Sequence, residues 1–477
     1  RQMCIRDRFS DYAVHEKDTF NILKTGREWY GERYGDQTEY EYTFNFPNIV
    51  EDYKVSLKTN LAAHSTEESW FDFYYGHQHL LEAEISKIVV GTTVYAWTTT
   101  PDTVGFYPTG GDEVKIRVTY DKPVSTSLGW MNYISVNARR KMTFTSPMMD
   151  FRDHLGYGVG EVAEYKLSGV GDDITVWEVT DPFNVTKHTG MLSGGNFIFR
   201  SPAGMLREFI AFDGKAELKP SFIEKIENQD LHGTNSVEYI ILTHPDLREQ
   251  AERMLSIHQE LDGMSGLIVY PQQIYNEFSS GKQDPSAIRD FVRMMYNKAD
   301  SNNRQMYLLL LGDASYDYKD RVPSNTNFVP TYQSIEALKL GYSFVTDDYF
   351  GCLDPAEGVN GYGKSIEVGI GRFPVHTKKQ ADDVVNKIEA YITMKPQVLE
   401  PWRNDIFFIA HDGDQNLHFS QAEKLQEMLD TGNHEYNRMK IYCDAFPLES
   451  TPYGDRYPDV NESIDLMMER GALIVNY

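Results

Sequence analysis

Residues 307–313 read Tyr-Leu-Leu-Leu-Leu-Gly-Asp, an apolar run that stops at a glycine and an aspartate. An uninterrupted apolar run of this length predicts a strand buried on both faces. Similar runs stand earlier, at 237–242 and 267–270, and helical patterns begin at Pro245 and at Asp284. Strands that alternate with helices predict a parallel sheet with helices on both faces.

The same alternation continues toward the C-terminus. Further strands are predicted at 366–370, 406–410, 439–443 and 472–475. Two capping boxes predict helix starts, one formed by Thr377 and Gln380 and one by Ser420 and Glu423. We therefore expect an incomplete α/β domain over residues 235–477, with a first subdomain at 235–400 and the start of a second at 401–477.

In the N-terminal half, apolar and polar side chains alternate with a period of two residues. Residues 114–118 alternate apolar and polar side chains, and Gly194-Gly195 separates two apolar runs as a hairpin turn would. Asp213-Gly214 is interpreted as another such turn. Frequent turn signals without a helical period predict an all-β, antiparallel, sandwich-like region over 9–234, with one or two β domains.

The opening octapeptide, Arg1–Arg8, matches the translation of a transposase adapter used in sequencing libraries. We expect these eight residues to be an adapter artefact and the native start to be lost. On that interpretation, the missing signal peptide carries no information about the compartment.

Composition and net charge exclude several classes of function. The chain has 46 Lys and Arg against 71 Asp and Glu, for a net charge of −25. This charge argues against binding to nucleic acid or anionic lipid, and it is compatible with Ca²⁺. No apolar run approaches the ~20 residues of a membrane helix, so no transmembrane segment is expected. Cys352 and Cys443 have no local nucleophile setting and are interpreted as structural.

Polar residues gather where the predicted strands end, which is where α/β folds place their function. Five aspartates surround the loop after the strand predicted at 307–311: Asp313, Asp317, Asp347, Asp348 and Asp354. They suit Ca²⁺, or they form a solvated loop in an acidic protein. His411, Asp412, Asp414 and His418 cluster at a second strand end, as ligands, as a substrate pocket, or as charge at a helix N-terminus.

Several stretches carry a family resemblance. They are Leu310–Asp317, Phe328–Tyr332, Thr346–Gly351, Gly369–Pro374, Gly471–Tyr477 and, in the β half, Gly26–Tyr34. In this order they resemble the gingipain-type cysteine peptidases, which have a caspase-like fold, and in particular the surface sortase of the Bacteroidetes type IX secretion system. The likeness covers most of the chain from about residue 20.

The resemblance implies specific roles. The catalytic His and the nucleophilic Cys of the family follow the strand at 472–475, so both are expected beyond Tyr477, and no residue of this chain is assigned to catalysis. Asp313, Asp412 and His418 are the implied Ca²⁺ ligands. Gln415 and His418 are the implied substrate-binding residues. Arg-specific members have Asp where this chain has Gln415, which argues against Arg specificity.

Two functions follow. The resemblance implies the N-terminal part of a cell-surface cysteine endopeptidase or sortase that removes C-terminal sorting domains from type IX secreted cargo. Its implied place is the outer face of the bacterial outer membrane, reached by secretion, with other outer-membrane secretion components as possible partners. The alternative is a non-catalytic surface adhesin or scaffold with an inactive caspase-like domain. A His within a few residues of Tyr477, and a Cys some 30 later, would favour the enzyme.

Overall fold

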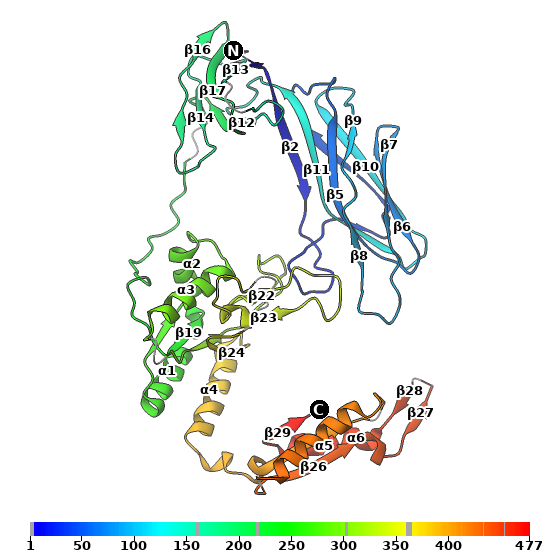
Figure 1. Ribbon diagram of the computed structural model, residues 1–477, viewed down its shortest axis with the longest axis vertical. Coiled ribbons are helices and arrows are strands. Elements are labelled where there is room, and N and C mark those ends of the chain that lie inside the picture. Colours follow the sequence, from blue (N-terminus) through cyan, green and yellow to red (C-terminus); the bar gives the residue numbers. More distant parts are fainter. Residues whose placement is uncertain are drawn as a thin grey trace. The chain divides into compact units, whose positions relative to one another are not determined.

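The structure is a computed structural model, and it describes all residues except 1–3, 159–161, 216–218, 301–303, 359–364, 412, 433 and 453. Contacts divide the chain into two compact units. The first comprises Arg1–Arg248 and Met264–His376, and the second comprises Glu249–Gly263 and Thr377–Tyr477. Figure 1 labels most of their helices and strands, where there is room. No helix in the described ranges has the length and apolarity needed to cross a membrane.

A first β-sandwich forms part of the first unit. One sheet has the order β4-β10-β6-β7, with β4 at Glu39–Asn45, β10 at Glu113–Asp121, β6 at Ser69–Tyr75 and β7 at Gln78–Ile85. It faces a ten-stranded sheet through β5 (Val55–His64) and β11 (Leu128–Lys141). Alternate residues of both sheets, such as Phe71 and Val136, form the shared core. The period-two pattern at 114–118 is thus the inward face of β10.

The ten-stranded sheet continues into a second core. Its order is β15-β14-β18-β12-β2-β11-β5-β8, with β3 and β9 paired beside it. The remaining bounds are β15 Thr186–Lys187, β14 Thr175–Glu178, β18 Glu208–Phe212, β12 Met148–Arg152, β2 Arg8–Glu16, β8 Trp97–Thr99, β3 Arg33–Tyr34 and β9 Val104–Phe106. Phe151 and Phe209 pack here against Tyr165 and Phe199 of a four-stranded sheet. The strands of that sheet are β1 Cys4–Arg6, β13 Val162–Ser168, β17 Asn196–Pro202 and β16 Met191–Ser193.

The expected all-β N-terminal region is confirmed. Apart from the parallel pair β1 and β13, the ladders of this region are antiparallel. The Gly194-Gly195 turn joins β16 to β17, and both glycines have positive φ. No strand follows Asp213-Gly214 in the described part of the linker, so the hairpin expected there is not observed.

A parallel sheet follows in the same unit. Its order is β20-β19-β21-β24, with β19 at Tyr239–Thr243, β20 at Gly266–Val269, β21 at Tyr307–Leu311 and β24 at Gly369–Phe373. Helices α2 (Pro271–Phe278) and α3 (Pro285–Lys298) pack on one face, with Phe291 against Leu308 and Leu310 in one core. The Asp284 carboxylate caps α3 by accepting from the Ser286 N–H at 2.8 Å.

The second unit repeats the pattern. Its parallel sheet has the order β26-β25-β29, with β26 at Asn437–Tyr442, β25 at Asp405–Ala410 and β29 at Ile474–Asn476. Helix α5 (Leu417–Asp430) covers one face and α6 (Pro458–Arg470) covers the other. In the same unit, α1 (Arg248–Asp262) lies beside α4 (Lys378–Ile392), with Arg253 paired to Glu389 at 3.1 Å. The sheet β26-β25-β29, with α5 on one face and α6 on the other, confirms the expected helices on both faces.

Two further local predictions need correction, and one helix was missed. The box at Ser420 and Glu423 does not start a helix, because α5 already begins at Leu417. Helix α2 was not predicted, since it has only 8 residues and no full period to recognise. The strand expected at 366–370 is β24, three residues later.

The β-rich region contacts the α/β region within the first unit through residues 334–340. The Ser334 carbonyl accepts from the Arg27 N–H at 2.9 Å, and the Leu338 carbonyl accepts from the Tyr95 N–H at 3.0 Å. The Leu338 side chain is buried among Tyr30 and Trp130. A small antiparallel pair precedes and follows this loop, β22 (Tyr332–Gln333) with β23 (Val345–Thr346).

Glu277, near the end of α2, holds the linker that enters the α/β region. Its carboxylate accepts from the Leu231 N–H and the Gln229 amide, each at 2.7 Å, and from the His232 N–H at 3.0 Å. Burial alone would raise the pKa of this carboxyl, but these hydrogen bonds lower it to about 2.

We expect Glu277→Gln to lower the free energy of unfolding by about 1–3 kcal/mol at pH 7, because an amide oxygen accepts fewer and weaker hydrogen bonds than a carboxylate. A carboxyl with a lowered folded-state pKa stabilises fully above its unfolded value near 4.5 and loses this effect as pH falls toward 2. Urea unfolding at pH 7, 4 and 3 should therefore show the two proteins converging at acid pH. Glu260→Gln, on the exposed side of α1, is the control, and an equal loss there would contradict the assignment.

Candidate functional site at the carboxyl ends of the parallel strands

Asp313 follows β21 at the carboxyl edge of the first parallel sheet. Its carboxylate accepts from the Thr326 hydroxyl at 2.8 Å and from the Ala314 N–H at 3.0 Å. Its carbonyl accepts from the N–H groups of Phe328 and Val329. Asp313 therefore closes the loop that runs from the end of β21 to residue 329.

The neighbouring aspartates Asp317 and Asp347 also accept hydrogen bonds from nearby groups. Asp317 is fully buried and accepts from the Val322 N–H at 2.5 Å. Asp347 accepts two hydrogen bonds from Arg372, at 2.7 and 2.8 Å. In the part of the chain that the structure describes, Asp313 forms no group with two further carboxylate or imidazole ligands. The Ca²⁺ role of Asp313 stays a prediction.

Arg372, at the end of β24, organises this edge. Besides Asp347, its guanidinium donates to the carbonyls of Gly312 and Val329 at 2.8 Å, and to that of Pro330 at 3.1 Å. These contacts use all five N–H donors of an arginine. Its side chain is only 12% exposed, and it joins the end of β21 and the loop after it to β24, in addition to the backbone hydrogen bond from the Gly312 N–H to the Phe373 carbonyl.

The second parallel sheet ends at a different cluster. His411, Asp414 and His418 each offer one ligand atom, and these atoms lie within 4.8 Å of one another. The Asp414 carboxylate caps α5 by accepting from the N–H groups of Leu417 at 3.0 Å and His418 at 3.2 Å, and it pairs with the His418 imidazole. Asp412, the third predicted ligand, lies outside the described residues.

The electrostatics of this cluster follow from its geometry. Burial alone would raise the pKa of Asp414, but the hydrogen bonds from the helix N–H groups and the two nearby imidazoles hold that pKa below its usual range. Two imidazoles and one carboxylate suit a Zn²⁺-like ion better than Ca²⁺, which prefers six to eight oxygen ligands. Among the described residues, the donor set at His418 holds only one carboxylate, and a calcium role for this residue stays a prediction.

Gln415 and His418, the implied substrate-binding residues, both lie at the start of α5. Gln415 has a φ of +62°, and its side chain is exposed in the turn before the helix. His418 is the second residue of α5 and is also exposed. Both side chains belong to the strand end where the resemblance implies a specificity pocket, and their roles stay predictions.

Of the three cysteines of the chain, Cys352 and Cys443 are the two that were interpreted as structural. Cys352 is 2% exposed, and burial followed by the carboxylates of Glu357, Glu367 and Asp348 raises the pKa of its thiol. A raised pKa opposes formation of the reactive thiolate. Cys443 packs against the core between α6 and β26. Cys352 is buried and Cys443 is partly buried against a core, as expected for the structural role that the sequence predicts.

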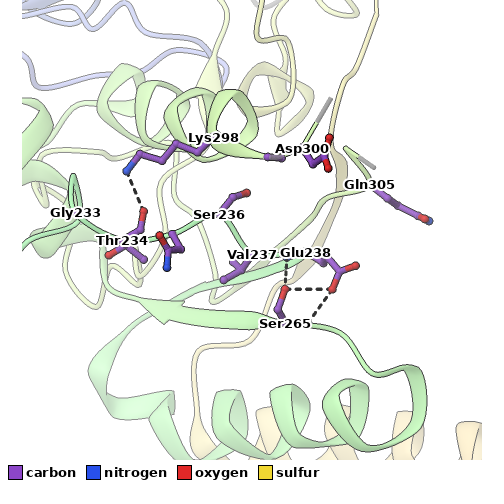
Figure 2. Close-up of a pocket in the computed structure, with 11 residues that line it drawn as sticks. Gly233, Thr234, Ser236, Val237, Glu238, Ser265, Lys298, Asp300 and Gln305 are labelled. Carbon is purple, nitrogen blue, oxygen red and sulfur yellow. Dashed lines mark hydrogen bonds between the residues drawn. The ribbon is translucent and has the colours of Figure 1, made fainter. Parts of the chain in front are cut away.

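Two cavities flank the first parallel sheet. Figure 2 shows one of about 600 Å³, where Lys298 donates to the Thr234 carbonyl at 2.9 Å and Ser265 donates to Glu238. It lies by the amino ends of β19 and β21, the edge away from the expected function. The other, of about 450 Å³, lies by the start of α3 and the loop after β21.

The sequence analysis did not identify the second cavity. It is lined by Arg27, by the start of α3 and by residues 315–333. Two of the stretches that carry the family resemblance meet at this cavity, Gly26–Tyr34 and Phe328–Tyr332. Their resemblance to the same family is the one sequence signal that connects them. Nothing in the spacing of segments so far apart indicates that they share a cavity.

Comparisons with known proteins agree with this architecture. The family model described as Peptidase family C25 matches residues 232–477, about half of the chain. No curated protein matches. The crystal structure of dimeric latent PorU from Porphyromonas gingivalis aligns with a TM-score of 0.72 and 20% identity, covering 88% of this chain and 43% of that chain. The present chain thus spans less than half of PorU, and at this identity the likeness establishes the fold.

A further alignment is much weaker. The carbohydrate-binding module CBM36, in complex with calcium and xylotriose, aligns with a TM-score of 0.18 and 11% identity, over 26% of this chain and 98% of that chain. Such a score supports no conclusion about ligands.

Proposed function

This chain belongs to peptidase family C25, and from that premise we propose that it is the N-terminal part of a cysteine endopeptidase that acts as a type IX sortase. The observation that carries the proposal is the match over both parallel sheets, together with the fold shared with PorU. The stretches that resemble the type IX sortase include Gly26–Tyr34 in the β-rich region, and they support the assignment as a sortase. The substrates are secreted cargo proteins with C-terminal sorting domains, met at the cell surface alongside other outer-membrane secretion components.

The geometry of the second sheet supports a location for the catalytic dyad. β29 runs parallel to β25, and Asn476 is paired with Phe408. The residue two positions after Asn476 would therefore be level with Ala410, next to His411. In our proposal the family's His follows Tyr477 at this edge, and the Cys follows the next strand. The imidazole then assists the thiolate, and backbone N–H groups stabilise the oxyanion.

The exposed side chains at the start of α5 are proposed to contact the substrate. Gln415 offers an amide, where a carboxylate would be needed to bind guanidinium strongly. His418, held by Asp414, offers an imidazole edge beside it. We therefore propose that the residue before the cleaved bond is small or polar and uncharged.

The test compares two proteins. Full-length protein should cleave a model cargo that carries a sorting domain, and iodoacetamide or replacement of the His after Tyr477 by Ala should abolish this. Residues 1–477 alone should show no cleavage, and a peptide electrophile should label neither Cys352 nor Cys443. Peptides with Ser before the cleaved bond should react faster than peptides with Arg.

Two outcomes would contradict the proposal. If full-length protein shows no thiol-dependent cleavage, the alternative of a non-catalytic adhesin or scaffold holds. If Cys352 or Cys443 is labelled, the dyad has been placed wrongly. A strong preference for Arg would remove only the role of Gln415.

A further inference from the structure

The cavity of about 450 Å³ beside α3, called the α3 pocket from this point, has the features of a built binding site. Its lining comes from Arg27, from residues 282–286, from the loop at 315–333 and from Tyr349. All of these belong to the first unit. Because α3 begins and β21 ends at this place, the α3 pocket lies at the carboxyl edge of the first parallel sheet.

A buried amide in the α3 pocket lacks a partner. Gln333 is 4% exposed, and its Nε2 donates to the carbonyls of Ser315 at 3.2 Å and Tyr316 at 3.1 Å. These two bonds fix the orientation of the amide. Its Oε1 has no hydrogen-bond partner among the described residues. An unpaired buried acceptor costs about 1–3 kcal/mol, so Oε1 is well suited to accept from a bound N–H group.

Aromatic faces form one wall. The rings of Tyr332 and Tyr349 stack with their centroids 4.4 Å apart, and the Tyr349 hydroxyl lies 3.0 Å from the Ser286 Oγ. The Arg27 guanidinium lies 5.4 Å from the centroid of the Tyr332 ring. Both rings are 7% exposed, so they contribute a small apolar area to the wall that a ligand would meet.

The rim is cationic in a protein of net charge −25. Arg27 and Lys282 are exposed, and neither has a carboxylate partner within the described ranges. Lys319, on the same rim, is paired with Asp18 at 3.3 Å. The carboxylate of Asp284 is engaged in capping α3. Two cations thus remain available to a ligand.

We propose that the α3 pocket docks an extended peptide segment that carries a carboxylate. The carboxylate meets Arg27 and Lys282, a main-chain N–H donates to Gln333 Oε1, and the apolar part of the segment lies on Tyr332. A peptide supplies an amide donor for Gln333 Oε1 and an acidic group at neighbouring positions, whereas a glycan of uronic acids supplies carboxylates without a main-chain N–H. The choice of a peptide rests on the proposed function.

The test is fluorescence anisotropy with the full chain. The probe is a fluorescein-labelled, C-terminally amidated octapeptide with three glutamates among serine and leucine. A second probe has glutamine in place of glutamate, and a third has glutamine together with a free C-terminal carboxylate. The first or the third should bind, which identifies the source of the carboxylate, and the second should bind at least about tenfold more weakly.

Variants connect the binding to the α3 pocket. Arg27→Ala should weaken binding about tenfold, and Arg27→Lys should recover part of the loss. Lys282→Glu, from a different segment, should weaken it in the same direction. Arg33→Ala, an exposed arginine outside the pocket, should leave it unchanged, and circular dichroism verifies that each variant is folded.

The inference is overturned if all three probes bind equally, if Arg27→Ala and Lys282→Glu have no effect, or if polygalacturonate binds in an Arg27-dependent way while the peptides do not. Binding requires no catalysis. Cargo cleavage without peptide docking would therefore refute the inference alone, and docking without cleavage would refute the proposed function alone.

Discussion

Arg372→Met is expected to lower the free energy of unfolding by about 3–5 kcal/mol, because it leaves a partly buried carboxylate without its cation. The five hydrogen bonds of this guanidinium join Asp347, Gly312, Val329 and Pro330. Methionine keeps the length of the aliphatic stem and removes every donor. The measurement is urea unfolding, together with the rate of proteolysis in the loop at 313–331.

The substitution has two informative controls. Arg372→Lys keeps the charge but cannot form the planar fork, so it should recover less than half of the loss. Arg33→Met changes an exposed arginine of β3, away from the carboxyl edge, and it should stay within about 0.5 kcal/mol. Equal losses at Arg372 and Arg33 would show that the network at the carboxyl edge contributes nothing specific.

Strands and helix starts with a local cause were predictable from sequence. The apolar run at 307–311 is β21 with the same bounds, since a buried parallel strand needs apolar side chains on both faces. The caps at Asp284 and Thr377 were also predicted correctly, because one side chain near the first turn is sufficient.

Elements that depend on distant contacts were not predictable in the same way. β24 begins three residues after the predicted start, at Gly369. In the fold its lack of a Cβ makes room for the Tyr307 ring, because a Cβ there would lie 2.8 Å from that ring. The start of α5 was misplaced because the Asp414 carboxylate, rather than the Ser420 hydroxyl, caps the helix.

The candidate site was likewise predictable from sequence only in part. The strand ends at Asp313 and His411 followed from the topology, because parallel strands place their carboxyl ends on one edge. The α3 pocket did not, since Arg27 and Gln333 are brought together by the contact between the β-rich region and residues 334–340. That contact is itself open to a direct test.

Gly26→Ala is expected to lower the free energy of unfolding by about 2–5 kcal/mol, because it strains the backbone where residue 26 meets residues 336 and 337. Gly26 has a φ of +79°, and a Cβ there would lie 2.5 Å from the Glu336 carbonyl oxygen and 2.9 Å from the Cα of Ala337. The left-handed conformation alone costs alanine about 1–2 kcal/mol. Overpacking against backbone that cannot move freely adds about 1–3 kcal/mol. The total is measured by urea unfolding.

Gly91→Ala separates the two causes. Gly91 has a φ of +86° with open space around its Cβ position, so it carries the conformational cost without the clash. Leu338→Ala tests the same contact from the other side, and loss of its buried side chain should cost about 2–5 kcal/mol. Both Gly26→Ala and Leu338→Ala should expose residues 334–340 to protease, and Gly91→Ala should not. The prediction is contradicted if Gly26→Ala and Gly91→Ala lose equal stability and neither exposes residues 334–340. In that case the close approach at Glu336 does not hold the β-rich region to the α/β region. Arg27 would then lack the contact that places it at the α3 pocket.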